Sequence, residues 1–327
     1  EMPKLLALGL TQLPGLAAYL AQLRRKIRDI SPNVVHSNGL KTHLLLGCTH
    51  ADFPAVCHIR DFVGRRRLVR RVFPWLLPRR AVCIANSAAV RDDLLRIASA
   101  VPCRVIYNAV DTGHFCPGSA AHEFIDRAAG MPLAEVETKR IGVIGAFGRW
   151  KGLDLFLDAA ANVVKTLPQQ ALRFYIVGGP IYQTKGSQYT IAELRNQVAC
   201  LGLEKHVGFT GFQEDPRDFY RALDIVVHCA TQPEPFGRTI VEAMSCGRCV
   251  IAASAGGARE LFTHEHDAYG ITPGSVSALA DAIVFLLQSP ELCRRLAQNA
   301  RQTVLQRFTR ETLGAQLTAL YQELAVD

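Results

Sequence analysis

The sequence of 327 residues lacks internal repeats and low-complexity tracts, which argues against repeat architectures and disordered chains. Among its 10 cysteines only Cys246 and Cys249 form a CxxC pattern, and no second pair at zinc-site spacing accompanies it. The pattern runs from a predicted helix end into a predicted strand, so we expect buried, reduced thiols there rather than metal or redox chemistry. Hydrophobic residues at 49% and charged residues at 20% predict a folded globular protein with room for two domains.

The sequence also lacks an unbroken apolar run of membrane-spanning length. Leu5–Leu23 carries no charge, but Pro14 and Gly15 interrupt it and several Thr and Gln residues dilute it. From Leu16 to Ile30 the apolar residues have helical spacing. We therefore expect an amphipathic helix after the Pro14 break rather than a membrane span.

Acidic residues are scarce in the first third of the chain. Residues 1–115 hold 17 Lys and Arg against 7 Asp and Glu, whereas the remainder holds 20 against 22. A basic surplus of this kind occurs in proteins that bind nucleic acid, anionic membranes or anionic substrates. No nucleic-acid recognition motif accompanies the charge, so we expect no nucleic-acid partner.

Short apolar strands alternate with amphipathic helices along most of the chain, a pattern that predicts parallel sheets covered on both faces. Strands are predicted at 34–36, 55–59, 81–85, 104–107, 141–144, 173–177, 206–210, 224–229 and 249–253. Helices are predicted at 41–48, 88–97, 153–166, 191–201, 216–223, 238–246, 276–287, 290–308 and 310–326. Residues 116–138 are rich in Pro, Gly and small residues and are predicted to connect two α/β domains.

The segment Glu234–Glu242 places two carboxylates eight positions apart around a helix start. Pro235 and Gly237 predict a turn, and the following apolar spacing predicts a helix that stops at Gly247. The first turn of a helix offers free N–H groups and the positive end of its dipole, which suit an anion. Carboxylates beside such a site suit the hydroxyl groups of a sugar nucleotide, although two acids at this spacing are also common on ordinary surface helices.

A glycine-rich turn at residues 141–152 is the second candidate anion site. Lys151 lies between a predicted strand and helix, with Arg149 two positions earlier, so both cations can reach a diphosphate. The glycines at 142, 145 and 148 are three apart rather than in the pattern GxGxxG, which disfavours a nicotinamide-binding fold. Solvated surface cations are the simpler alternative.

Together the segments Glu234-Pro-Phe-Gly237, Glu242-Ala-Met, Gly247 and Ala255-Gly-Gly-Ala-Arg-Glu260 resemble the donor site of retaining glycosyltransferases of family 4. The resemblance extends over nearly the whole chain from about Pro32 onward. It implies the GT-B fold, in which two Rossmann-like domains with parallel sheets face each other across a cleft.

The resemblance also implies a domain organisation. It gives an acceptor-side domain at 1–115, a linker at 116–138, a donor-binding domain at 139–308 and a final helix at 309–327 that packs back toward the first domain. Only about thirty residues precede the matching part, so we expect the first domain to lack early strands and a glycine-rich loop.

By this resemblance Glu234 binds hydroxyls of the donor sugar and Glu242 binds both ribose hydroxyls. Lys151 and Arg149 stabilise the leaving diphosphate, and His58 contacts the donor sugar or the acceptor. A lone His at a strand end is more often structural, so that second reading of His58 stays open. The remaining predicted donor contacts are Phe236, Gly237, Arg238, Thr239, Phe212, Gln213, Gly256 and Gly257.

The sequence and the resemblance together predict a retaining glycosyltransferase. It would move a sugar from a nucleotide sugar to a glycan or lipid-linked acceptor, in cell-surface polysaccharide, lipopolysaccharide or glycolipid synthesis. No Asp-x-Asp occurs, and His264–Asp267 lies in a predicted connection, so we expect neither a metal site nor a cofactor. The alternative is a non-catalytic fragment that binds a sugar nucleotide without a complete acceptor domain.

A basic and aromatic segment predicts where such an enzyme would meet a membrane. Cations alternate there with large apolar groups, a combination that suits an anionic membrane surface. The residues are Arg65, Arg66, Arg67, Arg70, Arg71 and Trp75. We expect a cytoplasmic protein, peripheral on the inner face of the cell membrane if this segment docks; the alternative is a solvated basic helix.

Overall fold

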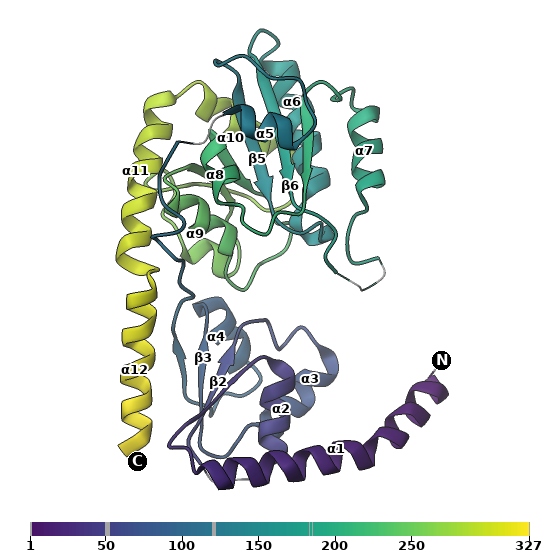
Figure 1. Cartoon of the computed structure of the whole chain (residues 1–327), viewed down its shortest axis with the longest axis vertical. Coiled ribbons are helices and arrows are strands. Elements are labelled where there is room, and N and C mark those ends of the chain that lie inside the picture. Colours follow the sequence, from purple (N-terminus) through teal and green to yellow (C-terminus); the bar gives the residue numbers. More distant parts are fainter. Residues whose placement is uncertain (1, 50–52, 120–121, 183, 185, 327) are drawn as a thin grey trace. The chain divides into compact units, whose positions relative to one another are not determined.

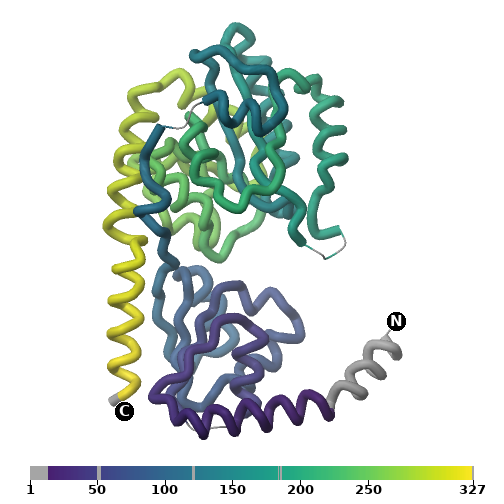
Figure 2. Tube along the Cα trace, in the orientation of Figure 1, coloured from purple at the N-terminus to yellow at the C-terminus, as the bar shows by residue number. Residues whose placement is uncertain are grey.

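The computed structural model describes the whole chain except residues 1, 50–52, 120–121, 183, 185 and 327; the side chains of residues 2–13 and 326 also lie outside the description. The chain divides into two compact units. Unit 1 comprises residues up to Tyr107 together with those from Gly314 onward, and unit 2 is Asn108–Leu313. The chain therefore passes from unit 1 into unit 2 and returns through its last helix (Figure 1, Figure 2).

Unit 1 is built on short parallel strands with helical connections (Figure 1). In chain order its elements are α1 (Met2–Ile30), β1 (Val35–Asn38), α2 (Leu40–Cys48), β2 (Ala55–Ile59), α3 (Arg67–Val72), the 3₁₀ turn η1 (Phe73–Leu76), β3 (Ala81–Ala85), α4 (Ala88–Leu95), β4 (Cys103–Val105) and most of α12 (Arg310–Val326).

The strands of unit 1 pair in the order β1-β2-β3-β4, the same as their order along the chain. All five residues of β2 are buried, as expected for a strand covered on both faces. Side chains alternate between the faces of a strand, so Cys57 and Ile59 enter the core with Phe73 while His58 lies on the opposite face. Ser87 caps α4 by accepting a hydrogen bond from the Val90 amide at 3.1 Å.

Unit 2 holds the larger sheet. In chain order its elements are α5 (His122–Ala128), β5 (Lys139–Ile144), η2 (Arg149–Lys151), α6 (Leu153–Thr166), β6 (Leu172–Val177), α7 (Ile191–Cys200), β7 (Val207–Gly211), α8 (Arg217–Ala222), β8 (Ile225–His228), α9 (Arg238–Ser245), β9 (Cys249–Ala253), η3 (Gly257–Glu260), β10 (Tyr269–Ile271), α10 (Val276–Leu287), α11 (Pro290–Arg307) and the first turn of α12.

In the described part of unit 2 the strands run parallel in the order β10-β9-β8-β5-β6-β7. The chain starts in the middle at β5, builds outward through β6 and β7, then returns beside β5 with β8 and builds the other way. This reversal creates a switch point between β5 and β8, and ligands of such sheets bind beyond the carboxyl ends of the strands there. The core under the sheet is formed largely by apolar residues of α6 and α10, including Phe156 and Ile283.

The predicted α/β class with parallel sheets in two Rossmann-like halves is confirmed. Six predicted elements agree to the residue: β2, β3, β9, α6, α10 and α12. The three-residue strand β10 was not predicted because so short a segment carries no readable alternation. The predicted helix start after Pro14 is wrong, since α1 runs through Pro14 from Met2. A proline removes one hydrogen bond from a helix, which kinks it without necessarily ending it.

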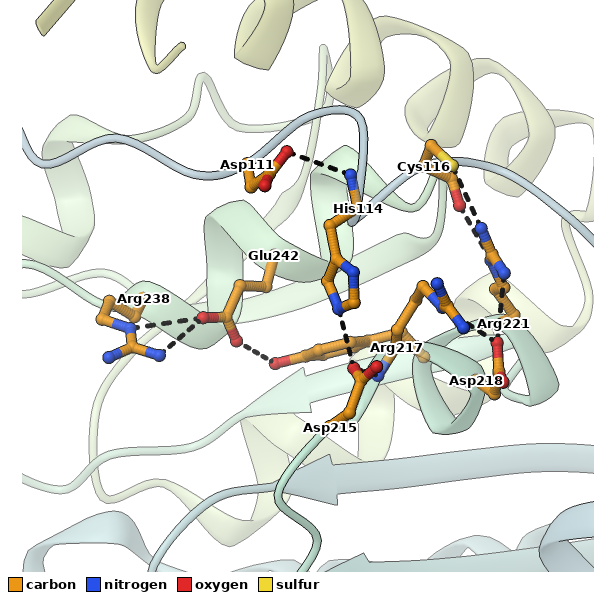
Figure 3. Close-up of polar contacts among 10 residues, drawn as sticks. Asp111, His114, Cys116, Asp215, Arg217, Asp218, Arg221, Arg238 and Glu242 are labelled. Carbon is orange, nitrogen blue, oxygen red and sulfur yellow. Dashed lines mark hydrogen bonds and ion pairs between the residues drawn. The ribbon is translucent and has the colours of Figure 1, made fainter. Parts of the chain in front are cut away.

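The predicted connection at 116–138 is also wrong, because it contains α5, which is anchored in unit 2. Asp126 of α5 is fully buried and accepts a hydrogen bond from Arg140 at 2.9 Å and one from Tyr175. The preceding segment is anchored as well: His114 contacts Asp215 at 2.9 Å and Arg221 donates to the Cys116 carbonyl at 2.9 Å (Figure 3). The described residues of this segment thus belong to unit 2 and do not form a free linker.

Among the described residues, no single helix is both long enough and apolar enough to cross a membrane. In the part of the chain that the structure describes, the pair α10 and α11, bent by 102°, meets that length and composition together.

Candidate active site

The loops that the sequence singled out in unit 2 all follow the carboxyl ends of its strands. Gly145 and Lys151 follow β5, Phe212 follows β7, Glu234 follows β8 and Gly256 follows β9. Because β5 and β8 are neighbours, Lys151 and Glu234 belong to the two loops at the switch point. The topology therefore brings together segments that lie more than eighty residues apart in sequence.

Glu234 is a buried carboxylate of this region that two side chains hold in place. It is 6% exposed, and its two oxygens have different partners: Lys151 Nζ lies 2.5 Å from Oε1, and His228 Nε2 lies 3.0 Å from Oε2. Burial alone would raise the pKa of Glu234, but the hydrogen bonds and charges of His228 and Lys151 lower it to about 2. The carboxylate is thus ionised and fixed at neutral pH.

Two glycines allow the backbone to approach Glu234 closely. Gly256 has φ +61°, and a Cβ there would lie 2.6 Å from the Glu234 carbonyl oxygen. The Gly257 amide donates to that carbonyl at 2.8 Å. The loops after β8 and β9 are therefore joined through backbone atoms, which is why glycine suits position 256.

α9 begins at the predicted turn and presents Glu242 one turn later. Gly237 precedes the helix with φ +113°, a conformation that favours glycine, and Gly247 follows it with φ +64°. Glu242 is 6% exposed and accepts hydrogen bonds from Tyr220 Oη at 2.8 Å and from Arg238 Nη2 at 3.0 Å (Figure 3). Burial and the neighbouring carboxylate raise the pKa of Tyr220, so its phenol stays a donor.

The two predicted cations of the β5 loop differ in environment. Lys151 is bound to buried Glu234, whereas Arg149 donates to Glu193 Oε1 at 2.6 Å and to the Gly186 carbonyl at 3.1 Å. The guanidinium of Arg149 also lies over the ring of Tyr189, 4.5 Å from its centroid. In this structure Arg149 therefore engages the segment leading into α7 rather than Glu234.

The other predicted donor contacts lie in two groups around this edge of the sheet. Phe212 is 65% exposed beyond β7, and the Gln213 side chain donates to the Thr210 carbonyl at 3.0 Å. Phe236 is buried with an edge-on contact to Phe308, while Thr239 lies half-buried in the first turn of α9. Phe212 is the most open of these side chains and the one best placed to stack on a flat ring.

His58 belongs to unit 1 and does not lie at the end of its strand. It is 7% exposed on β2, and its ring centroid lies 5.6 Å from that of His36, whose Nδ1 contacts Tyr321 Oη at 2.5 Å. His58 Nε2 has no hydrogen-bond partner among the described residues. Burial, with the nearby charges of Arg60 and the other histidines, lowers the pKa of His58 to about 4, so the ring is neutral at pH 7.

The sequence analysis missed His228 and Tyr220, each of which binds one of the two carboxylates. His228 is the last residue of β8, and Tyr220 is a buried residue of α8. An apolar strand that ends in His six residues before Glu234 was a usable signal for the first. Tyr220 had none, because its contact to Glu242 depends on how α8 packs near α9.

In the segment His264–Asp267, His264 and Asp267 take part in hydrogen bonds within the protein. The Gly270 amide donates to His264 Nδ1 at 3.0 Å, and Thr303 Oγ1 donates to Asp267 at 2.7 Å. Within the described ranges, no three His, Cys, Asp or Glu residues are grouped to hold a metal ion.

Solved structures share this architecture over almost the full chain. HepE of Anabaena, solved with UDP, is 28% identical, with a TM-score of 0.81 over 93% of this chain and 82% of that chain. The same protein has been solved with UDP-glucose, at 29% identity and a TM-score of 0.80. The protein thus has the fold of the GT-B glycosyltransferases, as the sequence predicted.

Family models identify the chain more closely. The model for glycosyl transferases group 1 matches residues 131–303, and the model for glycosyltransferase family 4 matches residues 1–114. The chain belongs to the glycosyl transferases group 1 family, which confirms the predicted resemblance.

Two curated relatives illustrate the range of this family. The lipopolysaccharide core biosynthesis mannosyltransferase LpcC of Rhizobium leguminosarum bv. viciae is 29% identical over 77% of this chain and 67% of that protein. A D-inositol 3-phosphate glycosyltransferase of Corynebacterium glutamicum (strain R) is 30% identical over 74% of this chain and 57% of that protein. The matches thus span between about half and two-thirds of these relatives.

Proposed function

We propose that this protein transfers a sugar from a nucleotide sugar to an acceptor hydroxyl, with retention of configuration and without a metal ion. The acceptor would be a glycan or a lipid-linked molecule in the synthesis of cell-surface polysaccharide, lipopolysaccharide or glycolipid. LpcC, a lipopolysaccharide core mannosyltransferase by name, supports that class of acceptor.

The observation that carries the proposal is the Lys151–Glu234–His228 cluster at the switch point of unit 2. A buried carboxylate held by two donors is a fixed acceptor for sugar hydroxyls. The ammonium of Lys151 is a fixed charge for the phosphate that leaves. Since both lie beside the start of α9, one site offers hydroxyl recognition and anion stabilisation together.

The other donor roles follow from the same placement. The backbone of Phe236–Thr239 at the start of α9 would bind sugar and phosphate, and Gly256 and Gly257 would let the donor approach. Glu242 would bind the ribose hydroxyls, for which it would exchange its exposed partner Arg238, whose side chain is 73% exposed. Phe212 and Gln213 would contact the base.

The proposed chemistry needs no protein nucleophile. The bond from the anomeric carbon to the diphosphate breaks, and the departing phosphate oxygen accepts the proton of the acceptor hydroxyl. That hydroxyl oxygen then bonds to the anomeric carbon on the same face, which retains the configuration. The protein contributes positioning and charge stabilisation, the latter through Lys151 and, once it leaves Glu193, Arg149.

Titration calorimetry with UDP, GDP and ADP, without added metal, tests the donor site. The complexes of HepE make UDP the first nucleotide to try. We expect one nucleotide to bind preferentially, and Lys151→Ala and Glu242→Ala to weaken its binding at least tenfold. Lys165→Ala, an exposed Lys at the far end of α6, is the control that should bind normally. Equal binding by all four proteins would reject the site.

Transfer itself separates the enzyme from a fragment that only binds the donor. The nucleotide that binds names the sugar nucleotides to be tested with lipid-linked and glycan acceptors, and proton NMR of the product gives the anomeric configuration. Product with inverted configuration would reject retention. Donor binding with no transfer to any acceptor would favour the non-catalytic fragment.

We further propose that the protein is cytoplasmic and docks on an anionic membrane through α3 and η1. Leu68 and Trp75 are 75% and 86% exposed, while Phe73 is buried and anchors the segment in the core of unit 1. Five exposed arginines surround the two apolar side chains: Arg65, Arg66, Arg67, Arg70 and Arg71. Exposed apolar groups ringed by cations are suited to the interface of an anionic bilayer.

Sedimentation with phosphatidylglycerol vesicles tests this docking against pure phosphatidylcholine vesicles. We expect binding to the anionic vesicles alone, abolished by changing the five arginines to Ser and strongly reduced by Trp75→Ala. Arg294→Ser with Arg295→Ser removes exposed charge from α11 and should leave binding intact. Vesicle binding that survives the arginine changes would exclude this surface.

A further inference from the structure

A cavity in unit 2 lies at the opposite edge of the sheet from Glu234. It has a volume of about 320 Å³ and is lined by the first residues of three strands, Lys139 of β5, Ile225 of β8 and Cys249 of β9. Leu286 of α10 and Cys293 of α11 complete its wall. Because these strands are parallel, their first residues lie at the amino edge, away from the loops of the candidate active site.

Two thiols share this cavity. Cys249 is 3% exposed, whereas Cys293 is half-buried and lies in the first turn of α11. Cys293 Sγ donates to the Leu286 carbonyl at 3.3 Å, and both cysteine side chains line the same cavity, close enough for each to shift the pKa of the other. The partner of Cys249 is thus a residue 44 positions later in the chain and not Cys246 of the CxxC pattern, which is fully buried at the end of α9.

The two thiols have unequal reactivity. The hydrogen bond from Cys249 lowers the pKa of Cys293, and the same bond together with burial raises the pKa of Cys249. A thiolate is the attacking species in disulfide exchange, and Cys293 is also the more exposed of the two thiols, so we assign Cys293 as the nucleophile and Cys249 as the resolving thiol. Lys139, Arg248 and Arg294 line the cavity against the single carboxylate of Asp224, which favours an anionic reagent.

We propose that Cys249 and Cys293 form a thiol–disulfide exchange site, which an anionic low-molecular-weight disulfide enters through this cavity. The Cys293 thiolate attacks one sulfur of the small disulfide, forms a mixed disulfide and releases one small thiol. Cys249, after losing its proton to solvent, attacks Cys293 Sγ, closes the Cys249–Cys293 bond and releases the second small thiol. Two protein thiols are oxidised and one small disulfide is reduced to two thiols.

The chain carries two internal controls. Cys57 and Cys83 are register partners on β2 and β3, yet both are 0% exposed. A hydrogen bond from Cys83 lowers the pKa of Cys57 against the opposing effect of burial, so acidity alone would make Cys57 reactive. Cys200 at the end of α7 is exposed and offers simple access without a described thiol partner. Comparison of Cys249–Cys293 with Cys57–Cys83 and with Cys200 separates three effects on reactivity: the acidity of the thiol, its access to the reagent and the presence of a second thiol.

The experiment treats the reduced full-length chain with oxidised glutathione at pH 7, followed by acid quenching, alkylation and peptide mass spectrometry. We expect a Cys249–Cys293 cross-link without retained glutathione, a glutathione adduct at Cys200, and Cys57 and Cys83 alkylated as free thiols. Cys249→Ser should trap a stable glutathione adduct on Cys293. Cys293→Ser should leave Cys249 alkylated and unmodified by glutathione.

Two results would overturn the proposal. One is that Cys249 and Cys293 stay reduced while Cys200 is modified. Modification of Cys200 would show that the reagent was active, so the paired thiols would simply be unreactive. The other is a Cys57–Cys83 cross-link that forms as readily as Cys249–Cys293, since access through the cavity would then have no influence. Circular dichroism of each variant before treatment separates loss of reactivity from loss of folding.

Discussion

The buried polar groups of the two units differ in kind. In unit 1 they are mainly imidazoles and hydroxyls: Ser37 Oγ lies 2.6 Å from His43 Nδ1, and His43 Nε2 lies 3.1 Å from the His58 carbonyl. In unit 2 they include ion pairs, such as Arg140–Asp126 at 2.9 Å and Lys151–Glu234 at 2.5 Å. Buried ions persist where they are paired, and here one pair joins α5 to β5 while the other lies at the switch point.

The difference gives the units separate responses to acid. The pKa of His58 is about 4 in the folded chain against 6.5 for a free His, so its stabilising effect is complete above pH 6.5 and lost as the pH falls to 4. The pKa of Glu234 is about 2 against 4.5, so its contribution is complete above pH 4.5 and lost toward pH 2. Unit 1 should therefore weaken first on acidification.

The largest expected effect comes from breaking the buried pair of unit 2. Asp126→Ala leaves the guanidinium of Arg140, which is 1% exposed, without its carboxylate, and should cost about 3–5 kcal/mol. Urea unfolding followed by circular dichroism measures the loss. The matched control is Glu123→Ala on the same helix, whose pair with Arg127 is exposed and should contribute less than about 1 kcal/mol. Similar losses in both variants would contradict the distinction between buried and exposed pairs.

The next effect is a pH dependence that belongs to unit 1. From pH 6.5 to 4 the wild-type chain should lose about 3 kcal/mol more unfolding free energy than His58→Phe, because Phe cannot take up a proton in the unfolded state. Groups that are common to both proteins and distant from His58, including Glu234, cancel in this difference. Urea midpoints at four pH values measure it. Parallel curves for the two proteins would show that His58 is not held neutral by burial.

This comparison also marks how far the sequence could be read. The strands β2 and β3 and the helices α6 and α10 were predicted to the residue, because apolar period and caps are local properties. α5 was missed because Asp126 is a polar residue whose burial depends on Arg140 and Tyr175, which are distant in sequence. A charged residue that is buried by a partner distant in sequence cannot be distinguished from a surface residue by sequence alone.

The candidate site follows the same rule. Glu234, Lys151 and the glycines could be located because the turns and the helix start that hold them are encoded nearby. The partners could not: His228 completes the Glu234 cluster, Tyr220 holds Glu242, and Glu193 engages Arg149. These contacts arise from the strand order at the switch point and from helix packing. A local sequence pattern predicts neither.

A smaller effect sharpens the comparison within unit 2. Tyr220→Phe keeps the buried ring but removes the donor to Glu242, and should cost about 2 kcal/mol, as for a hydrogen bond to a charged group. Tyr182→Phe is the control, because Tyr182 is 37% exposed. The two variants are compared by urea unfolding. A loss below that of the control would mean that the exposed Arg238 satisfies Glu242 alone.

The smallest effect distinguishes the two cations of the β5 loop. Arg149→Ala breaks an exposed pair with Glu193 and should change the unfolding free energy by less than about 1 kcal/mol. Its nucleotide affinity, measured by the same calorimetry, should fall by no more than about tenfold, or 1.4 kcal/mol, because Arg149 must first leave Glu193 to reach a phosphate. A loss as large as that of Lys151→Ala would mean that the diphosphate outcompetes Glu193. The contribution of each cation to nucleotide affinity would then not follow from its burial in the free protein. In that case Glu193→Gln should raise nucleotide affinity, because the guanidinium of Arg149 would be free before the nucleotide binds.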